Sequence, residues 1–277
     1  MNISDRHSTV FVAGLAIYPV KGLRGLDLES AVIERQGLEH DRRWAVLRPD
    51  GRVLTQRELP GMARIDAVPE AGGVRLECAG HGGVHAVAGA VPITLNVWGT
   101  RVPAVVANAE GSAWLSRVLG QDCTLAYLAD PAARLVTPSH AQPGDVVSLA
   151  DGFPLLVTTT ASLAALNARL DPPIPMNRFR PNLVLDGDAA SIAPWVEDGW
   201  AAIELPGVRL RMVSACVRCT VTTLDHRTGV ATARKEPLRT LGLIHRNTEG
   251  GICFGMNATP ERLGSVQVGE AVRVILR

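Results

Sequence analysis

Residues 214–220 have the sequence Ser-Ala-Cys-Val-Arg-Cys-Thr, and they lie within a longer stretch that is rich in Val and Thr. Branching at Cβ favours a strand over a helix. Successive side chains of a strand point to opposite faces, so Cys216 and Cys219, three positions apart, are expected to face opposite sides. We therefore expect at most one of the two cysteines in any single site.

This Cys-x-x-Cys pair has four interpretations that the residues alone leave open. A zinc site needs a second pair or suitably spaced histidines, and Cys78, Cys123 and Cys253 are isolated in the sequence. A thioredoxin-like redox pair belongs at the start of a helix rather than in a strand. Two buried cysteines can also act simply as small apolar side chains. In the last interpretation one thiolate binds a soft or high-valent transition metal, and the neighbouring Arg218 favours the deprotonated thiol.

Outward from this stretch, most of the chain consists of short apolar segments separated by Gly and Pro. This pattern predicts an α+β chain that is predominantly β, with few short helices. The predicted strands cover residues 10–18, 30–35, 44–48, 53–55, 74–78, 91–97, 101–106, 155–159, 183–185, 201–204, 208–213, 217–224 and 271–276. Helices are expected from Asn108 to residue 119, over residues 161–170 with Thr160 as the cap, and over residues 238–245 after Pro237. The best boundary lies near residues 120–130, between the first predicted helix and the strand–helix unit that follows it. This predicts two β-rich units, residues 9–122 and 123–277.

Composition excludes several classes of function. A formal net charge of +1 and an aromatic content of 4% argue against a nucleic-acid partner, which normally requires a basic excess and stacking surfaces. The five cysteines form no paired framework, which favours a reducing compartment. The apolar run at residues 10–20 is broken by Gly14 and Pro19, and it is too short to cross a bilayer. We therefore expect a soluble cytoplasmic protein with no membrane partner.

A second group of candidates is basic and dispersed along the chain. Lys21, Arg42 and Arg180 each lie at the end of a predicted strand, where such side chains can converge on a phosphate group. Taken one by one, they can equally be solvated surface charges. Asn182 either hydrogen-bonds the edge of a heterocycle or closes a turn. The polar loop at residues 232–237 either contacts an anion or simply begins a helix, and His40, His226 and His245 are expected to be surface or hydrogen-bonded histidines rather than ligands.

Several separate motifs together resemble a known family. The chain is similar to MOSC-domain proteins that carry an N-terminal MOSC β-barrel region, in particular the mitochondrial amidoxime-reducing component and its bacterial relatives. The resemblance implies a MOSC β-barrel domain packed against an N-terminal β-rich domain. It rests on Ile17-Tyr18-Pro19-Val20-Lys21-Gly22, Asp41-Arg42-Arg43-Trp44, Phe179-Arg180-Pro181-Asn182-Leu183, Cys216-Val217-Arg218-Cys219-Thr220, and on residues 161–167, 234–238 and 268–272.

The resemblance implies a molybdenum cofactor (a molybdenum–molybdopterin complex) held by one protein thiolate. The second cysteine of the pair, Cys219, matches the metal ligand and catalytic position, and Cys216 matches a cysteine that is not a ligand. The other positions that match the cofactor pocket are Lys21, Gly22, Arg42, the loop Asp151-Gly152-Phe153, Arg180, Asn182 and Arg218. Gly22 departs from the family pattern, because relatives often have Ser there.

The implied reaction is the reduction of N-hydroxylated small molecules, such as hydroxylamines, hydroxamates and amidoximes, by oxygen-atom transfer to molybdenum. The sequence contains no four-cysteine iron–sulfur pattern, so we expect electrons from a separate protein of the ferredoxin, flavin or cytochrome type. No residue is identified as a proton donor. Two alternatives from other classes are a carrier that passes the cofactor on without turnover, and a sulfur carrier that uses a Cys219 persulfide.

Overall fold

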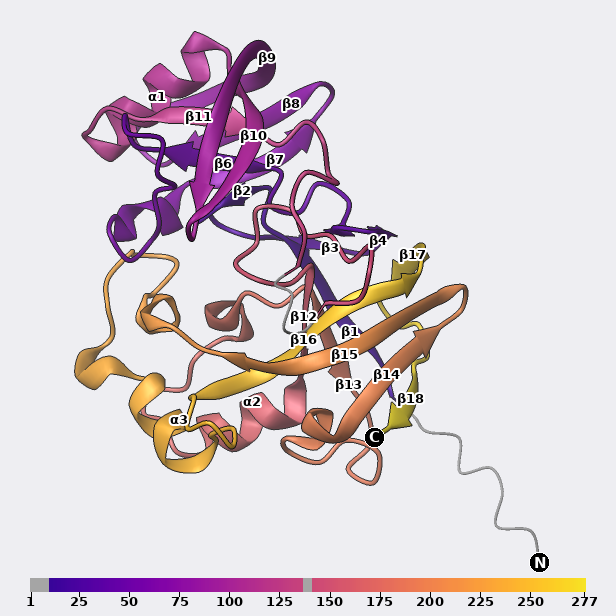
Figure 1. Ribbon diagram of the computed structural model, residues 1–277. Helices are drawn as coiled ribbons and strands as arrows, with labels where there is room; N and C mark the ends of the chain where they lie inside the picture. Colours follow the sequence, from indigo (N-terminus) through magenta and orange to yellow (C-terminus); the bar gives the residue numbers. More distant parts are fainter. Residues whose placement is uncertain (1–9, 137–140) are drawn as a thin grey trace, which may run out of the picture.

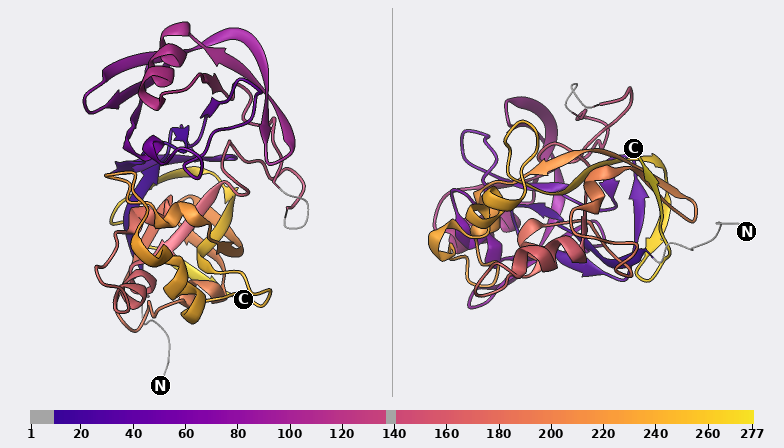
Figure 2. Two further views of the ribbon diagram at one scale, coloured as in Figure 1. Left: turned by 90° about the vertical axis from the view of Figure 1, so that its left-hand side faces the viewer. Right: turned by 90° about the horizontal axis from the view of Figure 1, so that it is seen from below.

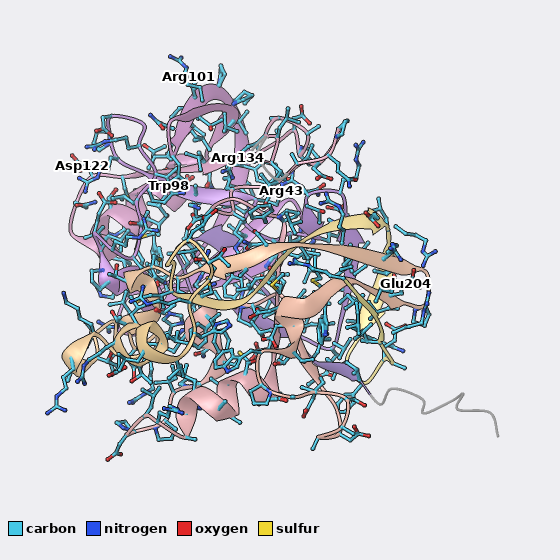
Figure 3. All side chains as sticks on the ribbon, turned by 60° about the horizontal axis from the view of Figure 1, so that its bottom comes forward. Arg43, Trp98, Arg101, Asp122, Arg134 and Glu204 are labelled. Carbon is cyan, nitrogen blue, oxygen red and sulfur yellow. The ribbon has the colours of Figure 1, made fainter. Side chains whose placement is uncertain are left out.

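The computed structural model describes residues 10–136 and 141–277, and it confirms the predominantly β chain with few short helices. Two large sheets define two halves of the molecule, one above the other in Figure 1. The first part of the chain builds most of the upper half, and the second part builds most of the lower half. Figure 2 shows the same two halves from the side and from below. Arg101 and Asp122 lie on the first half and Glu204 lies on the second (Figure 3).

The larger sheet combines strands from both ends of the chain. Its spatial order is β18 (Arg273–Leu276), β14 (Trp200–Leu205), β15 (Val208–Val217), β16 (Cys253–Arg262), β12 (Leu155–Thr159), β13 (Leu183–Asp186), β1 (Phe11–Ile17) and β3 (Leu26–Leu28). β1 pairs antiparallel with β13, so the first strand of the chain belongs to the sheet of the second half. Among the described residues, backbone pairing ends at β18 and β3 and does not close this sheet into a barrel. The division between residues 122 and 123 stays a proposal.

The other large sheet has the order β2 (Val20–Lys21), β6 (Trp44–Leu47), β11 (Thr124–Tyr127), β10 (Thr100–Ala107), β9 (Gly82–Val97), β8 (Gly73–Cys78) and β7 (Asp66–Glu70). Helix α1 (Ala109–Leu119) contacts β9 and β11 and buries Trp114 and Leu115. Gly120 follows it with a φ of 69°, the left-handed conformation expected where a helix ends. A small third sheet, formed by β17 (Gly264–Gln267), β4 (Ser30–Glu34) and β5 (Gly37–Leu38), joins the two ends of the chain.

Alternation of residue types explains how β15 leaves the core. Val208, Leu210 and Met212 are buried, whereas Arg209 and Arg211 between them are only partly buried and form ion pairs with carboxylates. This period of two is expected of a strand with one face on a core. After Met212 the register against β16 shifts twice, and the last residues of β15 are no longer buried. These irregularities bring Cys216 to the end of the sheet.

The strand predicted over residues 217–224 is wrong. β15 ends at Val217, and residues Thr220–Thr223 form a short 3-10 helix, η4. The hydroxyl of Thr222 donates to the carbonyl oxygen of Cys219 at 2.9 Å, and that of Thr223 donates to the carbonyl oxygen of Thr220 at 2.7 Å. Such local bonds compete with strand pairing, so β-branched threonines here stabilise a turn.

Two other expectations need a smaller correction. Helix α2 (Thr160–Asn167) is capped by Thr159 rather than Thr160, because the Thr159 side chain accepts a hydrogen bond from the backbone N–H of Ser162. α2 connects the parallel strands β12 and β13, as crossover helices do. Residues 53–55 form no strand, and Val53 makes only an isolated bridge with Leu47. Helix α3 (Leu238–Ile244) lies where it was expected.

Candidate functional site

One pocket contains every position that the family resemblance assigned to the cofactor. Its walls include Lys21 and Gly22 from the β2 region, Arg42, the loop that contains Gly152 and Phe153, and Arg180, Asn182, Arg218 and Cys219. These residues are up to 198 positions apart in sequence (Cys219 minus Lys21), and they come from both large sheets and their connections. The dispersed basic residues are thus neighbours around one cavity rather than separate surface charges.

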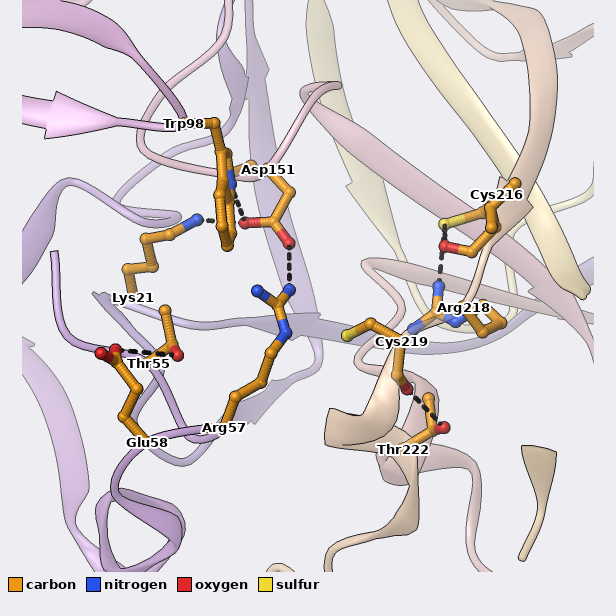
Figure 4. A network of polar contacts seen from close by, with 12 residues as sticks. Lys21, Thr55, Arg57, Glu58, Trp98, Asp151, Cys216, Arg218, Cys219 and Thr222 are labelled. Atoms are coloured by element: carbon orange, nitrogen blue, oxygen red, sulfur yellow. Dashed lines mark hydrogen bonds and ion pairs between the residues drawn. The ribbon is translucent and has the colours of Figure 1, made fainter. Parts of the chain in front are cut away.

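The two cysteines of the pair do not face opposite sides of a strand. Both Cys216 and Cys219 line the pocket, because Cys216 lies in the irregular end of β15 and Cys219 lies beyond it, at the cap of η4. The alternation rule applies only within a regular strand, so the expected separation is lost. Figure 4 shows the Cys219 sulfur on the side of Arg57 and Asp151. Neither cysteine forms a disulfide.

Arg218 contacts Cys216 rather than Cys219. Its Nη1 donates to the Cys216 sulfur at 2.9 Å and its Nη2 donates to the carbonyl oxygen of Phe179 at 2.6 Å (Figure 4 shows the bond to Cys216). Its Nε is buried and has no partner among the described residues. An unpaired buried N–H is unfavourable, so this donor at the pocket wall suits a bound polar group.

A polar network closes the opposite wall of the pocket (Figure 4). The buried Lys21 side chain forms an ion pair with Asp151, whose side chain is 60% exposed, and the Trp98 indole donates to the same carboxylate oxygen at 3.0 Å. Arg57 approaches the other oxygen at 3.7 Å, and its guanidinium carbon lies 4.7 Å from the centre of the Trp98 ring. Burial lowers the pKa of Lys21, although Asp151 opposes this shift. The network therefore holds two cations and one carboxylate beside the cavity.

Sequence analysis missed Arg57 and Trp98, and it placed Asp151 only within a loop. Trp98 has a φ of 52° at the turn between β9 and β10, and 55% of its surface is exposed. An exposed tryptophan before Gly99 at a predicted hairpin turn was a usable signal in a chain with few aromatic residues. Arg57 carries no comparable signal, because nothing in its local sequence distinguishes it from other arginines.

Tyr18 lies between the two arginines of the pocket. The guanidinium carbons of Arg42 and Arg180 lie 4.2 Å and 4.0 Å from the centre of its ring, which is a cation–π arrangement on both. The Tyr18 hydroxyl donates to the carbonyl oxygen of Pro181 at 3.1 Å. Burial raises the pKa of Tyr18 to about 12, although both arginines oppose the shift. Burial also lowers the pKa of Arg180 to about 10.

Both arginines adopt left-handed backbone conformations, with φ values of 48° for Arg42 and 56° for Arg180. Such values are uncommon for residues other than glycine and are concentrated at functional sites. Arg42 is further fixed by Asp41, which accepts from its Nη1 at 2.6 Å, and by Asn182, which accepts at 3.1 Å. The protein therefore holds these cations in place before any ligand binds.

Asn182 lines the pocket, but its side chain bonds within the protein. Its Oδ1 accepts from Arg42 and from the backbone N–H of Leu156 at 3.2 Å, and its Nδ2 donates to the carbonyl oxygen of Ala16 at 3.1 Å. The residue is 1% exposed. These contacts make Asn182 a bridge between β1, β12 and Arg42.

Gly22 has a φ of 83°, and a Cβ at this position would lie 2.9 Å from the Cε of Met62. The positive φ favours glycine at this position. The carbonyl oxygen of Gly22 accepts from the Gln56 side chain at 2.7 Å, which fixes the turn after β2. Gly152, in contrast, has open space around the position of a Cβ.

The remaining candidates lie away from this pocket. Residues 232–237 are not among its lining residues, and they include the short 3-10 helix η5 (Ala233–Lys235). His40 lines a separate pocket with Trp44 and Tyr127, and His226 is 7% exposed behind the arginines. Within residues 10–136 and 141–277, no group of three or more His, Cys, Asp and Glu side chains could hold a metal ion. The part of the chain that the structure describes contains no helix long and apolar enough to span a membrane.

Comparison with known families matches residues 9–122 to the MOSC N-terminal beta barrel domain and residues 144–273 to the MOSC domain. Mitochondrial amidoxime-reducing component 1 of Mus musculus is 30% identical over 288 residues, which cover 95% of this chain and 82% of that protein. The protein of the same name from Homo sapiens is 30% identical over 289 residues, with the same coverage of 95% and 82%. Molybdenum cofactor sulfurase of Solanum lycopersicum is 25% identical over 301 residues, which cover 98% of this chain and 36% of that protein.

These matches extend over nearly the whole chain and include the segments that line the pocket. The chain belongs to the family of MOSC-domain proteins with a MOSC N-terminal beta barrel domain, and it is about 30% identical to the mitochondrial amidoxime-reducing components named above.

Proposed function

We propose that the pocket binds a molybdenum cofactor with Cys219 as the sulfur ligand, and that the protein reduces N-hydroxylated small molecules. One observation supports this most directly: Cys219 lines the same pocket as Lys21, Arg42 and Arg180. The pocket thus combines a thiol donor with three cations. This is the combination that a metal attached to a phosphorylated organic group requires.

The residues present fit such a group. A thiolate is a soft donor that suits a high-valent transition metal, and Cys219 is only partly buried at the cavity wall. Arg42 and Arg180 are oriented by Tyr18, Asp41 and Asn182, so little side-chain entropy is lost when they bind an anion. When bound, the cofactor supplies the two-electron redox chemistry; the protein supplies the ligand, the anion contacts and the shape of the cavity.

The reductase assignment rests on the relatives whose names describe amidoxime reduction. For a hydroxylamine the overall change is R–NH–OH plus two electrons and two protons to R–NH₂ and water, with cleavage of the N–O bond. A second cavity adjoins the pocket and shares Cys216, Arg218 and Cys219 with it. We assign this cavity to the small-molecule substrate, because its lining includes the Cys219 thiol but neither Lys21 nor Arg42. Electrons come from a separate donor protein.

The first test measures molybdenum by elemental analysis in protein from a host that makes the cofactor. Wild type is expected to contain close to one molybdenum atom per chain, and Cys219→Ser is expected to lose most of it or to change its electronic spectrum. Cys216→Ser is the matched control, because it makes the same substitution in the same pocket and is expected to retain the metal. The same samples are then assayed with an aromatic hydroxylamine and reduced methyl viologen. Metal-free wild type, with the cofactor demonstrably supplied, would contradict the proposal.

A carrier function is the second candidate, and the similarity to a molybdenum cofactor sulfurase favours it. A carrier is expected to surrender its cofactor readily to an apo-enzyme and to show no turnover with hydroxylamines. A sulfur carrier is expected to show 32 Da of additional mass at Cys219, the mass of one sulfur atom. Metal retention with substrate turnover supports the reductase instead.

A further inference from the structure

The cavity that adjoins the pocket contains a titratable pair that the proposed function leaves unused. Besides Cys216, Arg218 and Cys219, its lining includes His245 at the end of α3 and Asp198 in the 3-10 helix η3 (Val196–Gly199). The pair thus borders the same space as the Cys219 thiol. Reduction of an N–OH group consumes two protons, and sequence analysis identified no group that supplies them.

Both ring nitrogens of His245 are engaged by acceptors. Nδ1 lies 2.9 Å from the carbonyl oxygen of Cys253, and Nε2 lies 2.7 Å from Oδ2 of Asp198. A carbonyl oxygen only accepts, so Nδ1 acts as an N–H donor, and a protonated Nε2 would donate to the Asp198 side chain. Burial opposes the charged ring, but the hydrogen bonds with Asp198 and Cys253 and the charges of Asp198 and Glu197 together outweigh it, and the pKa of His245 is raised.

The two side chains of the pair differ in exposure, and His245 is the more buried of the two. The His245 side chain is 12% exposed and the Asp198 side chain is 41% exposed. Oδ1 of Asp198 is buried, and Oδ2 is the oxygen that bonds to His245. The Trp195 indole stacks on the imidazole, with ring centres 4.2 Å apart and an angle of 16° between the planes. The histidine therefore lies behind an accessible carboxylate and cannot easily rotate away from it.

We propose that Asp198 and His245 form a proton relay that serves reduction at Cys219. In this assignment, which rests on the proposed function, His245 Nε2 passes its proton to Asp198 Oδ2, and the resulting carboxylic acid protonates the substrate oxygen or nitrogen in the cavity. The neutral imidazole then takes up a proton from solvent, and a second passage supplies the second proton. The two electrons come from the donor protein, or from reduced viologen in the assay, so R–NH–OH yields R–NH₂ and water.

The other charged groups near the pair come from η3 and from the lining of the cavity. Asp198 and the buried Glu197 face His245 from η3, and both favour its cationic form, while Cys253 from β16 contributes a carbonyl. The remaining charged residues of the same cavity are Arg57, Asp151, Arg218, Arg246, Glu249 and Arg277. Glu197 is 1% exposed and accepts hydrogen bonds from Thr159 and Ser162, so it has no direct path to the cavity.

The test uses holoenzyme and four proteins: wild type, His245→Gln, Asp198→Asn and, as matched control, His81→Gln. His81 is exposed and lines neither cavity. All four are expected to contain equal molybdenum. In wild type, kcat for an aromatic hydroxylamine is expected to fall as pH rises through the His245 pKa, because the imidazolium loses its proton. His245→Gln is expected to lose about 100-fold in kcat together with that pH limb, and Asp198→Asn is expected to lose a similar factor in kcat, because an amide cannot deliver the proton.

A ¹⁵N NMR titration of His245 provides a readout that is independent of turnover, and its midpoint is expected to move down in Asp198→Asn. Normal metal content and turnover, with the wild-type pH profile in both variants, would overturn the relay and leave the reductase standing. Normal metal content without turnover in wild type would overturn both. If His245→Gln fails to fold, the nearly isosteric Asp198→Asn decides the question alone.

Discussion

The guanidinium of Arg180 lies 4.0 Å from the centre of the Tyr18 ring, and the carbonyl oxygen of the next residue, Pro181, accepts the Tyr18 hydroxyl hydrogen bond. The same ring lies 4.2 Å from Arg42. Two like charges that converge on one anion repel each other when the anion is absent. The electron-rich ring of Tyr18 offsets part of this repulsion and fixes both cations in the pocket wall.

Tyr18→Leu is therefore expected to lose most of its molybdenum while its thermal unfolding temperature changes little. Tyr18→Phe keeps the ring and is expected to retain the metal. Each cation–π contact is worth about 0.5–2 kcal/mol. The measurements are elemental analysis and thermal unfolding. Tyr127→Leu is the matched control, because Arg43 lies 5.2 Å from that ring and neither residue lines the pocket. Equal metal loss in Tyr18→Leu and Tyr127→Leu would show that the effect is general destabilisation.

Asp151 acts as an internal anion for the cations of the pocket. The Asp151 pKa is depressed against the effect of its own burial, chiefly by Lys21. Asp151→Asn is expected to release Lys21 and Arg57, and to strengthen binding of inorganic phosphate to the apoprotein by about threefold to tenfold, measured by calorimetry. Asp50→Asn removes a comparable exposed partner of Arg52 and is expected to have no effect. Unchanged or weaker phosphate binding in Asp151→Asn would mean that Lys21 and Arg57 do not serve anions.

Gly22 can be tested directly against the family pattern. A side chain at its φ of 83° is strained, and its Cβ would contact Met62. Gly22→Ser is expected to destabilise the fold by about 1–2 kcal/mol, detected as a lower denaturant midpoint. Gly61→Ser is the control, because the Gly61 φ is not positive and nothing lies within 4 Å of its added Cβ. If the two variants have equal midpoints, the glycine is not required by the backbone at position 22.

The residues of the site could be predicted from the sequence more fully than the geometry of the site. Motif resemblance brought together Lys21, Arg42, Arg180 and Cys219, and all four line one pocket. The strand rule misplaced Cys216, because hydrogen bonds of Thr222 and Thr223 to nearby carbonyls end the strand early. Period-two alternation did predict the regular part of β15. Local patterns thus predict elements well where one face packs on a core.

What the sequence did not predict depends on long-range contacts. The pairing of β1 with β13, and that of β4 with β17, joins segments more than 160 positions apart. The Arg57–Trp98–Asp151 network and the His245–Asp198 pair likewise exist only because separate loops meet. His245 was interpreted as a surface or hydrogen-bonded histidine, and it is hydrogen-bonded on both ring nitrogens. Its position beside the cavity that contains Cys219 could not be inferred from neighbouring residues.

His226 predicts a specific pH dependence of stability. The imidazole is 7% exposed, its Nε2 has no partner among the described residues, and burial next to Arg180 and Arg178 lowers its pKa to about 3. In the unfolded chain its pKa returns to the usual value of about 6.5, so between these values the unfolded state binds the additional proton. The free energy of unfolding is therefore expected to fall as pH is lowered from about 6.5 towards 3, by up to about 1.4 kcal/mol per pH unit for this one group.

His226→Gln removes the titrating ring and keeps a neutral polar side chain, so the stability of this variant is expected to depend less on pH between 6 and about 4. Urea unfolding at several pH values in this window measures the slope. His81→Gln is the control, because His81 is exposed and its replacement is expected to leave the slope of wild type. Parallel curves for wild type and His226→Gln would mean that the imidazole has the same pKa in the folded state as in the unfolded chain, and is therefore protonated at pH 4. In that case the ring would carry a third positive charge beside Arg178 and Arg180, and the carboxylate of Asp225, which pairs with Arg178 at 3.6 Å, would offset part of it.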